Sequence, residues 1–120
     1  MTFKTASDLI VEAKSRIREV TAAEVAKSFR TAGAPILLDV REPNETNLGR
    51  AKGAILIPRG TLEGKIEAAI PRDAKVVVYC ASGNRSALAV DTMQQMGYTN
   101  AVNLIGGWNA WVGAGGPTEG

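Results

Sequence analysis

The stretch "VVVYCASGNRS", residues 76–86, places an apolar run, a cysteine and a glycine-containing loop in direct succession. Its three valines and tyrosine make the strongest strand pattern in the chain, because β-branched and aromatic side chains favour strands. Cys80 is the one cysteine in the sequence, and it stands where this run ends, five residues before Arg85. The residues from Ser86 to Gly97 favour a helix. The stretch therefore predicts a strand, a loop and a helix, with Cys80 at the start of the loop.

Short apolar runs alternate with amphipathic segments along the rest of the chain. Continuous apolar runs are typical of strands that a parallel sheet buries on both faces. They predict strands at 17–20, 35–40, 54–58, 75–79 and 101–105. Apolar residues at helical spacing predict helices at 6–16, 21–29, 61–70, 86–97 and within 106–116. The alternation indicates an α/β fold with a mostly parallel sheet of about five strands and helices on both faces.

These elements divide the chain into an N-terminal helical extension (1–16), a main domain (17–115) and a loose C-terminal tail (116–120). The extension is expected either to cover the sheet or to make a dimer contact. "TAAE" at 21–24 matches a capping box that starts the second helix. Gly33 suits the end of that helix.

Composition limits the classes of function. A length of 120 residues fits one domain, and 45% hydrophobic residues are enough for a sizeable core. The net charge is only +2 and no run of Lys and Arg occurs, so nucleic acid is not an expected partner. A weakly positive surface favours small anions. The sequence contains no histidine, which excludes Cys-His and Ser-His-Asp mechanisms within the chain, and we expect no metal site and no cofactor.

The sequence shows neither a signal peptide at its start nor an apolar run long enough to cross a bilayer. A single cysteine cannot form a disulfide within the chain. A free thiol persists in a reducing compartment, so we expect a cytoplasmic protein with no membrane partner.

Three residues of interest are expected at one edge of the sheet. Cys80 directly follows the predicted central strand, and Asp39 and Arg41 lie at the carboxyl end of another. Open parallel sheets bind ligands beyond the carboxyl ends of their strands. The order of elements therefore places these side chains at the functional edge, where Asp39 and Arg41 are expected to have a supporting role.

The loop after Cys80 has the features of an anion cradle. Gly83 permits a backbone conformation that other residues avoid, so successive amides can point inward. The following helix adds the positive end of its dipole, and Arg85 adds a full charge. Such surroundings lower the pKa of a thiol from about 8.5 towards the range of roughly 3.5–7.5, without a histidine base. The candidate substrate-binding residues are Ala81, Ser82, Gly83, Asn84, Arg85 and Ser86.

This loop, together with "LLDVRE" (37–42), "AILIPRGTLE" (54–63) and "GGWNAW" (106–111), resembles the single-domain rhodanese family of sulfurtransferases. The resemblance covers about residues 17–115 and leaves the extension outside. It implies that Cys80 attacks the outer sulfur of an anionic donor such as thiosulfate and keeps it as a persulfide. Cyanide, a cellular thiol or a sulfur-accepting protein would then take the sulfur.

Two positions depart from the family pattern. The family often has Arg directly after the cysteine, where this chain has Ala81, so one anion-binding charge is missing. The family also often has His in the stretch that is "GRAKGA" here, where Arg50 takes its place. The position of Arg50 is expected to be structural. The missing charge at Ala81 is expected to affect how efficiently thiosulfate is used.

Other functions remain as alternatives. One is a non-catalytic binding or regulatory module, against which the intact Cys80 counts. Another is a phosphatase or arsenate reductase, but such enzymes of this fold have five residues between Cys and Arg, and this loop has four. A third is a redox sensor, although the chain has no second cysteine to resolve an oxidised thiol.

Some residues also have plain structural explanations. Cys80 can be core filler, since free cysteines are often buried. Arg85 can be a surface residue, but a cation is unfavourable at a helix N-terminus, so it should have an anionic partner. Trp108 and Trp111 are expected to pack in the core and close the sheet, with a place at the mouth of the pocket as the alternative. Arg59 is expected either to approach the site or to lie on the surface.

Overall fold

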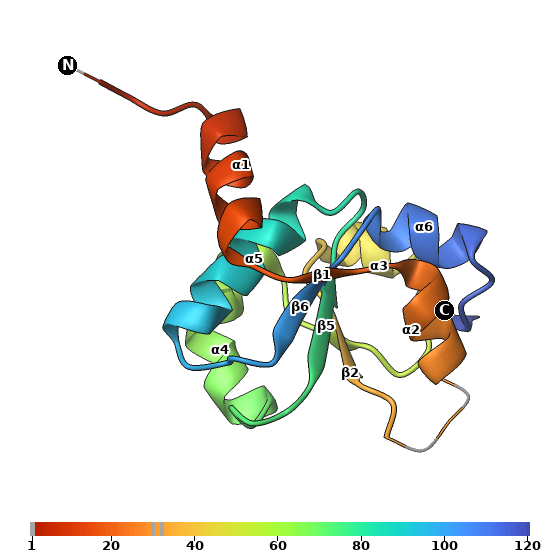
Figure 1. Cartoon of the computed structure of the whole chain (residues 1–120). Helices are drawn as coiled ribbons and strands as arrows, with labels where there is room; N and C mark the ends of the chain where they lie inside the picture. Colours follow the sequence, from red (N-terminus) through yellow and green to blue (C-terminus); the bar gives the residue numbers. More distant parts are fainter. Residues whose placement is uncertain (1, 30, 32) are drawn as a thin grey trace.

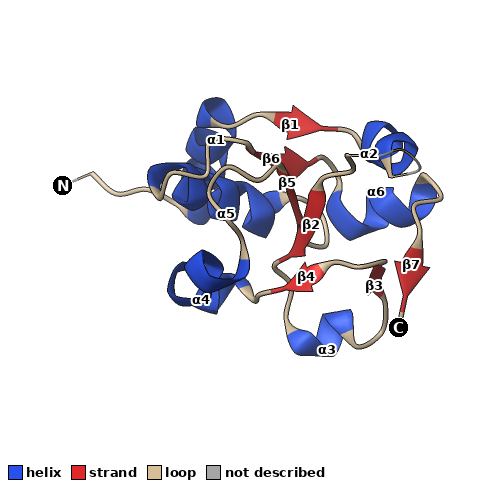
Figure 2. Ribbon diagram, turned by 90° about the horizontal axis from the view of Figure 1, so that it is seen from below, coloured by secondary structure: helices blue, strands red, loops and turns tan. Residues whose placement is uncertain are grey.

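A five-stranded parallel sheet forms the centre of the structure, a computed structural model that describes residues 2–29, 31 and 33–120. The strands follow the spatial order β1-β6-β5-β2-β4 (Figures 1 and 2). In that order they are Glu19–Val20, Ala101–Leu104, Val76–Tyr79, Ile36–Asp39 and Ile55–Leu56. All their pairings are parallel, and β5, which precedes Cys80, is the central strand. The predicted α/β class and parallel sheet are confirmed.

Helices cover both faces of this sheet (Figure 2). They are α4 (Leu62–Ala69) and α5 (Asn84–Gln95) on one side, and α2 (Ala22–Ser28) and α6 (Gly107–Gly113) on the other. Helix α1 (Ala6–Arg16) packs on α5. Val76 and Val78 join the first core cluster, whereas Val77 and Tyr79 join the second. Successive side chains of a strand point to opposite faces, so a strand buried on both has a continuous apolar sequence.

The helix at the start of the main domain begins as predicted and ends early. The Thr21 hydroxyl accepts a hydrogen bond from the amide of Glu24, whose carboxylate accepts one from Thr21, which completes the capping box. The helix ends at Ser28, and the rings of Phe29 and Trp111 pack in a T-shaped arrangement. Gly33 therefore lies beyond the helix rather than at its end, in a left-handed conformation.

The predicted loose tail at 116–120 is wrong, because its residues have partners. Thr118–Glu119 form strand β7, which pairs in antiparallel fashion with β3, Arg50–Ala51. The Pro117 carbonyl accepts hydrogen bonds from the indole of Trp111 and the amide of Lys52. Two-residue strands are too short to show a period-two pattern, which is why the sequence did not indicate them.

Two further differences affect the edge that carries Cys80. A one-turn helix, α3 (Pro43–Thr46), follows β2 where no helix was predicted. Helix α5 begins at Asn84, two residues before the predicted start at Ser86, and Gly83 is its N-cap. The first turn of α5 is therefore part of the loop at residues 80–86, called the Cys80 loop below. Within the described ranges, no helix has the length and apolar character that crossing a membrane requires.

Candidate active site

The Cys80 loop, residues 80–86, wraps hydrogen-bond donors around a buried thiol. The Sγ atom of Cys80 accepts hydrogen bonds from the Gly83 amide (3.1 Å) and from the amide and hydroxyl of Ser86 (both 3.4 Å). Only 1% of Cys80 is exposed. Gly83 has a φ of +104°, in the left-handed region that glycine tolerates without strain. The amides of Gly83 and Ser86 thus point toward Sγ, and a wider role of the loop amides in binding an anion stays a prediction.

The pKa of the Cys80 thiol lies below its ordinary value. Burial raises this pKa, but hydrogen bonds from the hydroxyl and amide of Ser86 and the amides of Gly83 and Ser82 outweigh the effect. These donors stabilise the thiolate more than the thiol. This direction matters chemically because the thiolate is the form that acts as a nucleophile.

Arg85 has the anionic partner that its place at a helix N-terminus requires. Its guanidinium donates to both carboxylate oxygens of Glu45, at 2.7 and 2.9 Å. This hydrogen bonding lowers the pKa of Glu45 to about 2 and raises the pKa of Arg85. The negative charge of the Cys80 thiolate adds to the raised pKa of Arg85. The hydrogen bonds of the Arg85 guanidinium go to Glu45, whereas those to Sγ come from Gly83 and Ser86.

Glu45 is a site residue that the sequence analysis missed. It lies in α3, and its carboxylate also accepts a hydrogen bond from the Glu42 amide at the start of that helix. The helix-dipole argument required some anion near Arg85 without identifying one. The sequence signal for the helix that carries Glu45 was Pro43, since proline is common at the first position of a helix.

Asp39 and Arg41 form a buried ion pair beside the loop rather than within it. The guanidinium of Arg41 lies 2.8 Å from a carboxylate oxygen of Asp39, with side chains 4% and 0% exposed. Arg41 also donates to the Gly49 carbonyl at 2.8 Å and lies over the ring of Trp108, 4.7 Å from its centre. The pair thus ties three segments together, and its supporting role in the reaction stays a prediction.

The N-terminal turn of helix α6 hydrogen-bonds to the backbone of the Cys80 loop. The amide of Trp108 donates to the carbonyl of Cys80 (2.7 Å), and the amide of Asn109 donates to that of Ala81 (3.3 Å). Gly107 makes this approach possible, because a Cβ there would overlap the Cys80 carbonyl oxygen and lie 2.9 Å from that of Ala81. The "GGWNAW" motif therefore brings a helix N-terminus against the backbone of the loop.

The two tryptophans pack as predicted. Trp111 is 1% exposed and belongs to the second core cluster. Trp108 stacks on Tyr79 with ring centres 6.4 Å apart. Among the residues that the structure describes, the hydrogen bonds to Sγ come from Gly83 and Ser86 and not from either tryptophan.

Asn103 is the second site residue that the sequence analysis missed. It lies on β6, is fully buried, and donates from Nδ2 to the Gly83 carbonyl (3.1 Å) and to Glu19 (2.9 Å). It therefore holds the glycine on which the turn of the loop depends. An asparagine in a strand gives no sequence signal of its own, since its partner lies 20 residues away.

The remaining polar residues near this edge are less enclosed. Arg59 donates to Glu63 (3.1 Å) and to Thr92 (3.2 Å), so it contacts the last turn of α5 rather than Sγ. Ser82 and Asn84 are exposed at the outer side of the loop. The side chain of Asn84 accepts a hydrogen bond from Lys14 of α1 (3.2 Å).

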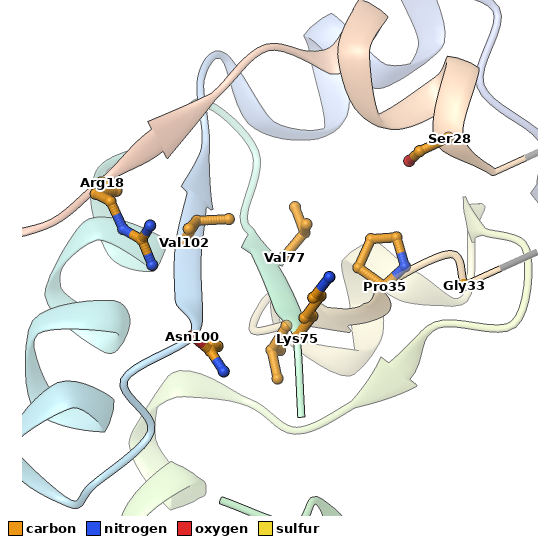
Figure 3. Close-up of a pocket in the computed structure, with 9 residues that line it drawn as sticks. Arg18, Ser28, Gly33, Pro35, Lys75, Val77, Asn100 and Val102 are labelled. Atoms are coloured by element: carbon orange, nitrogen blue, oxygen red, sulfur yellow. The ribbon is translucent and has the colours of Figure 1, made fainter. Parts of the chain in front are cut away.

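A cavity of about 370 Å³ lies at the opposite edge of the sheet (Figure 3). Pro35, Lys75 and Asn100, which precede β2, β5 and β6, line it beside Val77 and Val102. Within the described residues, its lining contains none of the predicted site residues. The loop chemistry and this cavity are therefore separate features.

Comparison with known proteins agrees with this architecture. The model of the rhodanese-like domain family matches residues 21–114. Thiosulfate sulfurtransferase 16, chloroplastic, of Arabidopsis thaliana is 32% identical over 118 residues, covering 88% of this chain and 97% of that protein. The probable adenylyltransferase/sulfurtransferase MoeZ of Mycobacterium tuberculosis is 41% identical over 76 residues, 62% of this chain. The chain spans about a fifth of the length of such adenylyltransferase/sulfurtransferases.

One solved structure matches almost the whole chain, including the extension that carries α1. It is a Rhodopseudomonas palustris protein described as of unknown function and a possible tyrosine phosphatase. The two are 34% identical with a TM-score of 0.88, and the match covers 99% of this chain and 97% of that one. From the family model and the relative matched over nearly its full length, this chain belongs to the family of rhodanese-like domains.

Proposed function

We propose that this protein is a sulfurtransferase that carries a sulfane sulfur on Cys80. The observation that carries the proposal is the hydrogen bonding of Sγ by the Gly83 amide and by the amide and hydroxyl of Ser86. These donors favour a thiolate, and they suit the negative charge of a persulfide equally well. The sulfurtransferase names of relatives support the same class of reaction.

In the first step, the Cys80 thiolate attacks the outer sulfur of thiosulfate. A bond forms between Sγ and that sulfur, the sulfur–sulfur bond of thiosulfate breaks, and its electron pair leaves with sulfite. Charge is conserved, because a thiolate and a dianion become a persulfide anion and a dianion. No proton moves, so the absence of histidine from the sequence is no obstacle.

In the second step, a thiophilic acceptor removes the outer sulfur. Cyanide attacks it, the new carbon–sulfur bond gives thiocyanate, and the electron pair of the sulfur–sulfur bond returns to Cys80 as thiolate. A cellular thiol or a sulfur-accepting protein would react in the same way. The reaction needs a free thiol between turnovers, which fits a reducing compartment such as the cytoplasm.

A phosphatase is the second candidate, because the Rhodopseudomonas palustris protein is described as a possible tyrosine phosphatase. The loop argues against it in this chain. Only four residues separate Cys80 from Arg85, and the Gly83 and Ser86 amides already lie within hydrogen-bond distance of Sγ. A cradle closed around one sulfur atom suits an added sulfur better than a tetrahedral phosphate.

The deciding experiment is intact-protein mass spectrometry after brief incubation with thiosulfate, beside a Cys80→Ala variant. We expect the unmodified chain to gain the mass of one sulfur atom, cyanide to remove it, and the variant to gain nothing. An unchanged mass with thiosulfate, mercaptopyruvate and glutathione persulfide would overturn the proposal in favour of a binding module. Hydrolysis of a phosphoester without any sulfur gain would favour the phosphatase.

A further inference from the structure

Helix α1 brings a positive charge to the outer side of the Cys80 loop. The Nζ atom of Lys14 donates to the Oδ1 atom of Asn84 at 3.2 Å. Asn84 is the first residue of α5 and lies between Gly83 and Arg85. Both Lys14 and Asn84 are exposed, so the ammonium group is open to an arriving ligand.

The position of α1 is fixed by contacts on both sides of Lys14. Ala13 is fully buried. Arg16 makes two hydrogen bonds to the carboxylate of Asp91 in α5, at 3.0 and 2.9 Å. Figure 1 shows the C-terminal part of α1, which carries Lys14, against α5, with the N-terminal part projecting away from the domain. Lys14 is thus held at the loop by its helix and not only by one flexible side chain.

The other cations at this edge are already neutralised. Arg85 pairs with Glu45, and Arg41 pairs with Asp39. Within the described part of the chain, the ion pairs include none for Lys14, and the nearby Glu12 binds Lys4 instead. Lys14 therefore retains its full charge for an anion that approaches the loop. At position 81, directly after the nucleophile, the side chain is an uncharged alanine.

We propose that Lys14 is a positioning residue that draws the anionic sulfur donor to the Cys80 loop and, through Asn84, orients it there. The inference rests on the proposed sulfurtransferase function for the identity of the donor. It assigns α1, which precedes the matched family domain at 21–114, to the substrate site rather than to sheet cover alone. A dianion such as thiosulfate responds to a nearby unit charge twice as strongly as a monoanion.

A binding measurement tests this without any turnover. In a Cys80→Ser background of the full chain, thiosulfate is titrated while the amide signals of residues 82–86 are followed by NMR. We expect Lys14→Gln to raise the Kd by about three- to tenfold, with the difference shrinking at high salt. Lys14→Arg should restore most of the affinity. Lys27→Gln removes the same charge from an exposed lysine of α2, on the other face of the sheet, and it should change the Kd little.

Steady-state kinetics give a second measurement in the chain that retains Cys80. Lys14→Gln should raise KM for thiosulfate by a similar factor and leave kcat nearly unchanged, because the charge acts on the arriving donor. Equal Kd values for Lys14→Gln and its parent, or no thiosulfate-dependent shift at residues 82–86 in the parent, would overturn the inference. Failure of sulfur transfer with normal, Lys14-dependent binding would instead contradict the proposed function alone.

Discussion

The amide nitrogen of Trp108 lies 2.7 Å from the carbonyl oxygen of Cys80, so the last helix is joined directly to the residue that carries the thiol. The contact joins α6 to the end of the central strand and fixes the backbone from which the loop departs. A loop that must keep several donors aimed at one sulfur needs such support, because small displacements weaken hydrogen bonds steeply.

Gly107→Ala should disrupt this contact between α6 and the Cys80 carbonyl. The position has a φ of +55°, and a Cβ would overlap the carbonyl oxygen of Cys80. We expect the free energy of unfolding to fall by more than about 2 kcal/mol in urea titrations, from backbone strain and steric overlap together. Gly113→Ala is the matched control in the same helix, since nothing lies within 4 Å of its added Cβ. Equal stability of the two variants would refute the proposed close approach.

Ser86→Ala should raise the pKa of Cys80. It removes the hydroxyl donor to Sγ but keeps the amides of Ser86 and Gly83. The ultraviolet absorbance of the thiolate, followed against pH, reports the shift in the pKa of Cys80, because the chain has one cysteine. We also expect persulfide formation at mildly acidic pH to slow by about three- to tenfold.

Ser82→Ala is the control for Ser86→Ala. Its side chain is exposed, and the backbone amide that contributes to the lowered pKa of Cys80 remains. The titration of Cys80 should be nearly unchanged. A shift as large as that of Ser86→Ala would contradict the role given to the Ser86 hydroxyl.

Glu45→Gln should change the dependence of stability on acid. Hydrogen bonding to Arg85 lowers the pKa of Glu45 from 4.5 to about 2. A carboxyl whose pKa is lowered by folding adds stability above its unfolded pKa and loses it as the pH falls towards the folded value. The stability gap between the two proteins should therefore be constant above about pH 5 and shrink between pH 4.5 and 2.

The size of that gap should be modest. Arg85 and Glu45 are 39% and 28% exposed, so solvent screens the pair, and we expect about 1 kcal/mol at neutral pH. Urea unfolding at several pH values measures it, with Glu67→Gln as control, since Glu67 pairs with Arg72 far from the loop. A gap that persists unchanged down to pH 2 would show that the charge of Glu45 is not responsible.

The sequence predicted the elements whose causes are local. The apolar run before Cys80 predicted the central strand, and Gly83 predicted the turn. Both predictions rest on local effects, the strand preference of β-branched side chains and the left-handed φ that glycine allows. Glu45 and Asn103 were missed because their partners, Arg85 and Gly83, are distant in the sequence and meet only in the folded sheet. The helix-dipole argument for Arg85 shows the limit: it required an anion but did not identify one.

Asn103→Ala should loosen the loop from the neighbouring strand. The Gly83 carbonyl and the Glu19 carboxylate would both lose the buried Nδ2 donor. The Gly83 carbonyl keeps its hydrogen bond from the Ala87 amide, and Glu19 is exposed, so the loss is that of ordinary hydrogen bonds. We therefore expect the free energy of unfolding to fall by roughly 0.5–1.5 kcal/mol for each of the two bonds. Because the lost bond holds Gly83, whose amide donates to Sγ, persulfide formation should slow as well, which mass spectrometry over a time course would measure.

Asn100→Ala gives the comparison that separates this effect from a general loss of asparagine. Asn100 is exposed, lies just before β6 and makes a 3.4 Å hydrogen bond to the Asp73 carbonyl, far from the Cys80 loop. It should lose little stability and load sulfur at the normal rate. If Asn103→Ala were destabilised but loaded sulfur as fast as Asn100→Ala, Asn103 would stabilise the sheet without positioning the loop. Slow loading at unchanged stability would instead place its whole effect on Gly83.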